Sequence, residues 1–106
     1  MKSAPLLQHL VPRFASELAA QLEQLGEAAL AEQVGALRVL DHERSGVAVY
    51  MYTAPRPGGP WGPTLRNVEL GVRRGMVILD VVDGRIAGVE VLGRGDIRAR
   101  LRELEE

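Results

Sequence analysis

Asp41, His42 and Glu43 stand side by side in the sequence and combine two carboxylates with an imidazole. Proteins use these groups to ligate metals and to transfer protons as general acids and bases. Neighbouring residues on a turn point in different directions, however, and the only other histidine, His9, is far away in the sequence. The pattern therefore favours a solvated turn without a metal. A small acid–base or metal-dependent enzyme remains the alternative.

Glu90 is a further candidate for acid–base chemistry, because it lies in an otherwise apolar segment on the same parity as Ile86, Gly88 and Leu92. A partly buried carboxylate needs a partner, and that partner is either catalytic or structural. We favour a structural ion pair with an arginine or a hydrogen bond to a backbone amide. The same interpretation applies to Asp80.

Signatures of known catalytic classes are missing from the sequence. The chain has no cysteine, which excludes a disulfide framework, a thiolate zinc site and a cysteine nucleophile. It also contains no phosphate-binding loop, dinucleotide fingerprint or nucleophile elbow. The sequence therefore favours a protein that is not an enzyme, and we predict no cofactor.

Aromatic side chains provide a candidate binding surface. Tyr50 and Tyr52 fall on one face of an expected strand, and Trp61 is the only tryptophan, in a stiff Pro/Gly segment at 55–63. Such loops display aromatic anchors at low entropic cost, so these three residues are candidates for binding a protein partner. The alternative is that the indole folds back and covers the protein's own core.

Arginines repeat near the C-terminus in a way that resembles a phosphate-binding face. Arg94, Arg98 and Arg102 are four residues apart on an expected helix. The glutamates that end the chain offset their charge, no aromatic residue interleaves them to stack bases, and the net charge is -1. Nucleic-acid binding is therefore a minor alternative.

Helical spacing dominates the first 36 residues, where we predict a helical hairpin or one broken helix. Pro12 suits a first helical turn, and Gly26 should end or bend the helix. A second segment, from Glu27 to Val34, should stop at Gly35 in a left-handed conformation. The residues expected on the buried face of the first helix are Phe14, Leu18, Leu22 and Leu25.

Strand-forming residues take over from 37 to 92. We predict a hairpin between short strands at 37–40 and 47–53, joined by a polar connection at 41–46, and a third strand at 67–70. Prolines require 55–63 to be a loop. Asp83-Gly84 lies between the apolar runs 76–82 and 85–92, which is a strong signal for a type I′ hairpin.

A short C-terminal helix should follow at 95–106, with Asp96 at its start and an apolar stripe of Ile97, Leu101 and Leu104. The expected fold is α+β, with 4–5 antiparallel strands in a single domain over residues 1–106. Both faces of the final hairpin are apolar, which predicts cover on both sides and a homodimer if the helices cover only one.

Neither the N-terminal residues nor the apolar segments of the sequence resemble a targeting or membrane-spanning segment. The N-terminal residues lack the sustained apolar stretch of a signal peptide, and no segment approaches the roughly 18 apolar residues of a spanning helix. We therefore expect a cytoplasmic protein without membrane association.

Residues 38–92 resemble a family of small prokaryotic domains of unknown function. The resemblance rests on Leu40-Asp41-His42-Glu43 before an alternating strand, on Ile78-Leu79-Asp80, and on a final strand of the form Asp-Gly-x-x-x-Gly-Val-Glu-Val-Leu at 83–92. It implies a compact β-meander with a helix and a tendency to self-associate. Together these features favour a small interaction or accessory protein that acts through protein–protein contacts and self-association.

Overall fold

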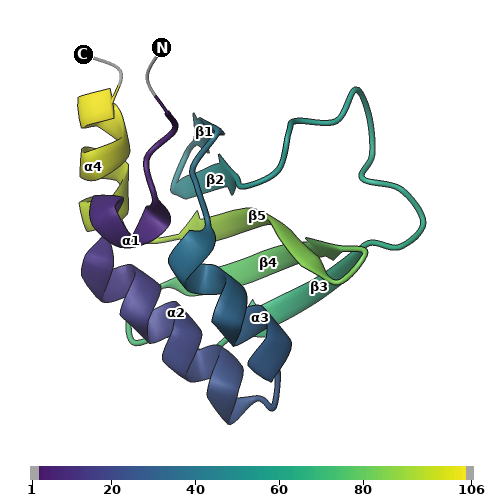
Figure 1. Cartoon of the computed structure of the whole chain (residues 1–106). Coiled ribbons are helices and arrows are strands. Elements are labelled where there is room, and N and C mark those ends of the chain that lie inside the picture. Colours follow the sequence, from purple (N-terminus) through teal and green to yellow (C-terminus); the bar gives the residue numbers. More distant parts are fainter. Residues whose placement is uncertain (1–2, 105–106) are drawn as a thin grey trace.

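A five-stranded antiparallel sheet organises residues 3–104, the part of the chain that the computed structural model describes. The strands lie in the order β1-β2-β5-β4-β3, so that the β4–β5 hairpin is central and β1 and β3 form the edges. Figure 1 shows this arrangement. The strands are β1 (Asp41–Ser45), β2 (Ala48–Tyr52), β3 (Arg66–Leu70), β4 (Met76–Val82) and β5 (Arg85–Leu92).

Helices from both ends of the chain pack on one side of this sheet (Figure 1). The predicted α+β class, helical N-terminus, antiparallel sheet and short C-terminal helix are confirmed. No helix within residues 3–104 is long and apolar enough to cross a membrane. The helical elements are α1 (Leu7–Leu10), α2 (Pro12–Gln24), α3 (Ala28–Gln33), a 3₁₀ turn η1 (Val34–Ala36) and α4 (Gly95–Leu104).

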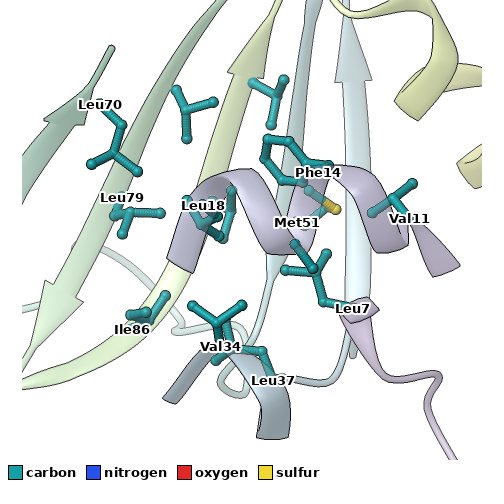
Figure 2. Close-up of a cluster of buried hydrophobic side chains, with 14 of the residues drawn as sticks. Leu7, Val11, Phe14, Leu18, Val34, Leu37, Met51, Leu70, Leu79 and Ile86 are labelled. Atoms are coloured by element: carbon teal, nitrogen blue, oxygen red, sulfur yellow. The ribbon is translucent and has the colours of Figure 1, made fainter. Parts of the chain in front are cut away.

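The buried stripe of α2 faces the sheet, and Figure 2 shows Phe14 and Leu18 among strand residues such as Met51 and Leu79. Pro12 occupies the first turn, as predicted. The prediction that Leu25 shares this stripe is wrong, since its side chain is 53% exposed. The helix already ends at Gln24, and Gly26 turns the chain away with φ of +77°.

The end of α3 differs from the prediction at Gly35. This glycine does not have a positive φ, because α3 tightens into the 3₁₀ turn η1 instead of closing with a left-handed residue. Such turns satisfy the last carbonyls of a helix without glycine chemistry. The chain then leaves in an extended conformation, and the backbone carbonyl of Leu37 accepts a bond of 2.8 Å from the N–H of Leu7.

The first hairpin lies further along the chain than predicted. The polar segment expected as a connection is strand β1 itself, while residues 37–40 lie outside the sheet's strands. The turn falls at Gly46, with φ of +57°, and at Val47, which is 67% exposed. As an edge strand, β1 exposes alternate side chains, so its sequence lacks the apolar signal that marks an inner strand.

The β4–β5 hairpin turns at Asp83 and Gly84, with φ of +52° and +77°, which confirms the predicted I′ geometry. A register shift between Asp80 and Val81 then places Ile86 opposite Val81. Ile86 is consequently buried under the helices, as Figure 2 shows, and the predicted shared parity with Glu90 is wrong.

Helix α4 packs beside α1, where the side chain of Arg100 donates a bond of 2.9 Å to the backbone carbonyl of Leu10. Ile97 and Leu101 are fully buried, as the predicted stripe requires. Leu104 is 44% exposed, because the helix runs past the core at its last turn. Residues 105–106 of the predicted helix lie outside the described residues.

Candidate functional site: the open face of the sheet

The side of the sheet that faces away from the helices is called the open face here. Because side chains alternate along each strand, the cross-strand register decides which residues share it. Tyr50 aligns with Glu43 on one side and Glu90 on the other, and Ile78 lies between Glu90 and Glu69. The face thus combines aromatic, acidic and apolar side chains from all five strands.

The Pro/Gly segment 55–63 is a loop, as predicted, and it brings Trp61 back onto this face. The indole Nε1 donates a hydrogen bond of 3.1 Å to Tyr50 Oη, and the Trp61 and Tyr52 ring centroids are 6.2 Å apart. The three predicted aromatic residues therefore do come together. Trp61 covers the protein's own tyrosines and keeps part of its surface exposed.

The hydroxyl end of the Tyr50 ring lies against Gly88 of β5. A Cβ at Gly88 would stand 1.8 Å from Tyr50 Oη, so only glycine leaves room for this ring. The hydroxyl donates a bond of 2.6 Å to Asp80, whose other oxygen accepts a 2.5 Å bond from Asn67. Burial, and then this carboxylate, raise the pKa of Tyr50 well above its usual range. Tyr50 is therefore a neutral donor and Asp80 has a structural role.

The acidic cluster predicted at the start of β1 does not converge on one point. Asp41 and Glu43 lie on the open face, whereas His42 lies on the opposite face. Arg56 pairs with both carboxylates, at 2.8 and 3.5 Å, and its guanidinium lies 4.5 Å from the centroid of the Tyr52 ring. Within residues 3–104 no group of three or more His, Cys, Asp or Glu side chains is placed to hold a metal ion.

Tyr52 also joins this cluster, because its hydroxyl donates a hydrogen bond to Glu43. That bond raises the pKa of Tyr52, and desolvation adds to the effect. Together with Arg56 it ties the Pro/Gly loop to the β1–β2 side of the open face. The candidate catalytic carboxylates of β1 therefore act as attachment points for the loop.

A depression of about 370 Å³, called the acidic hollow here, lies on the other side of the open face. Glu69 and Glu90 flank Ile78 in one cross-strand row. Within residues 3–104 neither carboxylate forms an ion pair or a side-chain hydrogen bond, although the other acids of this face are paired. The residues lining the hollow are Tyr50, Asn67, Glu69, Ile78, Asp80 and Glu90.

An apolar row borders the acidic hollow and is called the apolar strip here. It consists of Ala48, Leu92 and Met76, which are aligned across β2, β5 and β4. Met76 is 42% exposed. The uncovered part of the open face therefore places apolar surface directly beside two carboxylates.

Sequence reasoning identified Glu90 but missed Glu69 as a site residue. The alternation of Asn67, Val68 and Glu69 along β3 carried the signal that Glu69 faces away from the core. Only the register, however, places it opposite Ile78.

The predicted arginine face is not a common surface. Arg94 precedes α4 and is 8% exposed, with bonds of 3.1 Å to Asp96 and 3.0 Å to Glu17. Arg98 donates to the backbone carbonyl of Gly46, and Arg102 is exposed. Because Arg94 is held by two carboxylates, these arginines do not form a continuous track for a phosphate backbone.

Comparison of the whole chain with models of protein families, with curated proteins and with solved structures finds no significant match. The resemblance of residues 38–92 to small prokaryotic domains stays a prediction.

Proposed function

We propose that this protein is a small accessory protein that binds another protein through the acidic hollow and the apolar strip. The observation that carries the proposal is the row Glu90–Ile78–Glu69, in which two carboxylates without partners in residues 3–104 flank an apolar side chain. Fixed charges beside an uncovered apolar surface are typical of a surface that recognises a partner.

The charge of the acidic hollow defines the chemistry of that partner. A lysine or arginine of the partner would place its charged end between Glu69 and Glu90 and its aliphatic stem over Ile78. A neighbouring apolar side chain would cover Met76 and Leu92 on the strip. The expected ligand is therefore an extended segment in which a basic and an apolar residue stand two positions apart, so that both side chains face the sheet.

A second copy of the chain is the alternative partner, and the predicted homodimer stays a prediction. The apolar strip favours self-association, but two open faces packed together would bring Glu69 and Glu90 close to their counterparts. Like charges in contact are destabilising. Salt separates the two cases, because screening weakens the binding of a cationic partner and relieves the repulsion in a homodimer.

Trp61 provides a direct readout, since it is the only tryptophan and bonds to Tyr50 in the wall of the hollow. The probe is a synthetic peptide with the repeat lysine-serine-leucine-serine, in which lysine and leucine share one face of the extended chain, compared with a glutamate-serine-leucine-serine peptide of equal length. We expect a saturable change in fluorescence with the basic peptide only, and weaker binding as salt is raised.

The matched variants carry the same loss of charge in different places. Glu69→Gln with Glu90→Gln should weaken binding of the basic peptide by roughly tenfold or more, equivalent to about 1.4 kcal/mol of binding free energy. Glu23→Gln with Glu32→Gln, on the exposed surface of the helices, should leave binding unchanged. Equal binding of the acidic peptide, or equal losses in both double variants, would refute the proposed site.

A further inference from the structure

A second depression lies where the start of α2, the turn between β3 and β4 and the start of α4 meet, and it is called the basic cleft here. Its volume is about 1080 Å³, and it shares no lining residue with the acidic hollow. The charged residues of its wall are Arg13, Arg73, Arg74, Arg94, Glu17 and Asp96.

Both carboxylates of the basic cleft hold the buried arginine. Arg94 is 8% exposed, and its guanidinium bonds to Glu17 at 3.0 Å and to Asp96 at 3.1 Å through two nitrogens. It also lies 5.5 Å from the centroid of the Phe14 ring. Glu17 and Asp96 are thus both engaged by Arg94, although the side chain of Asp96 stays 52% exposed. The cleft keeps a net surplus of two positive charges from four arginines and two acids.

The remaining guanidinium groups are available to a ligand. Within residues 3–104 the side chains of Arg13 and Arg73 form no ion pair, and both residues are exposed. The side chain of Arg74 is 69% exposed and comes only to 3.7 Å from Asp96. Three arginines from two separate elements therefore surround one space.

The backbone holds the basic turn in place before any ligand arrives. The N–H of Arg73 donates a bond of 3.2 Å to Glu17 of α2. Gly75 has φ of +76°, and a Cβ there would lie 2.0 Å from the backbone oxygen of Leu92, so the turn packs directly against the end of β5. Preorganised cationic groups bind anions at a lower cost in entropy than mobile ones.

Helix α2 adds to the positive character of the cleft. It has 13 residues, begins at Pro12 and has no side-chain cap at its N-terminus. The uncapped N–H groups at the start of such a helix favour a nearby anion. Arg13 lies in this first turn, so the helix end and the arginines support binding of the same kind of ligand.

We propose that the basic cleft binds a chain of two or three phosphate groups. Arginine pairs with phosphate oxygens in a bidentate geometry, and three guanidinium groups suit several phosphates better than one carboxylate. The residues lining the cleft include no aromatic side chain on which a base would stack. Recognition should therefore reside in the phosphates, so inorganic tripolyphosphate and a nucleoside triphosphate should bind alike.

Isothermal titration calorimetry with the full chain tests this assignment. We expect tripolyphosphate and ATP to bind within about twofold of each other, pyrophosphate more weakly, and adenosine not at all. Binding of adenosine, or of ATP far more tightly than tripolyphosphate, would overturn the proposal. So would a duplex oligonucleotide that binds more tightly than tripolyphosphate and displaces it, because the surface would then be a nucleic-acid site.

Matched variants separate a specific site from general attraction by charge. Arg73→Gln with Arg74→Gln should weaken tripolyphosphate binding at least tenfold, and Arg13→Gln alone several-fold. Arg85→Gln with Arg102→Gln removes the same charge from exposed positions outside the cleft and should leave binding nearly unchanged. Circular dichroism confirms that each variant is folded, and equal losses in both double variants would contradict the proposed site.

Discussion

The acidic hollow and the basic cleft differ in whether their glutamates are paired with arginine. In the hollow, Glu69 and Glu90 have no partner within residues 3–104, so their charge faces the solvent. In the cleft, Glu17 neutralises the buried Arg94 and leaves the surface arginines available. The charge offered to a ligand therefore depends on which groups the fold has already paired, and composition alone does not reveal it.

Two arginines should differ in how much their ion pairs contribute to the stability of the fold. Arg94 is 8% exposed and links α2 to the start of α4, whereas the side chain of Arg56 is 45% exposed and ties a loop to the sheet. Ion pairs that are removed from water and hydrogen-bonded contribute more than pairs on the surface. Substitutions at the two sites should therefore differ in size.

The largest expected effect belongs to Arg94→Met. Removing the guanidinium leaves Glu17 in a partly buried position without its ion pair, and we expect the free energy of unfolding to fall by about 2–3 kcal/mol. This lies below the loss for a fully buried pair, because the side chain of Asp96 is 52% exposed. Urea unfolding followed by circular dichroism measures the change, and a loss below about 1 kcal/mol would contradict this role.

Tyr50→Phe should have the next largest effect. It removes the donor to Asp80 and the acceptor for Trp61, while Asn67 still bonds to Asp80, so we expect a loss of about 1–2 kcal/mol. Tyr52→Phe is the matched control, since its partner Glu43 is exposed, and should cost about 0.5 kcal/mol. Urea unfolding of both variants gives the comparison, and a reversed order would show that the Tyr50 network does not stabilise the open face.

Acid should weaken the cleft network in a predictable direction. The hydrogen bond from Arg94 lowers the pKa of Asp96, so the folded state binds a proton there less readily than the unfolded state. This contribution is fully present above the ordinary aspartate pKa of about 3.9 and is lost as the pH falls through the lowered value. Urea unfolding across this range should show the loss, and Arg94→Met should diminish it.

The smallest expected effect is that of Arg56→Gln. Its pairs with Asp41 and Glu43 are solvent-exposed, so stability should change by less than about 1 kcal/mol. The loop should nevertheless lose its contact with Tyr52, and the fluorescence of Trp61 should shift toward that of a more exposed indole. A large fall in stability would place Arg56 in the same class as Arg94 and remove the contrast between them.

Local signals predicted much of this fold. The turn at Asp83-Gly84 requires two positive φ values, and the residue types Asp and Gly alone predict it. Prolines likewise exclude strands from 55–63. Strand β1 was not predicted, because it is a polar strand at the edge of the sheet. Its sequence lacks the apolar alternation of an inner strand, and only its pairing with β2 shows that it is a strand. The displaced parity of Ile86 likewise depends on a bulge between two strands.

The sites depended even more on long-range geometry. Glu90 was identified from its apolar surroundings, but its neighbour Glu69 comes from a strand whose register only the fold defines. Arg94 was grouped with Arg98 and Arg102 by helical spacing, although its partner Glu17 lies 77 residues away. Spacing along one element cannot show which charges are already paired by another.

If the acidic hollow and the basic cleft are independent sites of opposite charge, each kind of ligand should perturb only one of them. Recording amide chemical shifts of one ¹⁵N-labelled sample with the lysine and leucine peptide and then with tripolyphosphate tests this most directly. We expect the peptide to shift residues of β3, β4 and β5 around Glu69 and Glu90, and tripolyphosphate to shift Arg13, Arg73 and Arg74. Shifts of one common set by both ligands, or competition between them, would contradict the account.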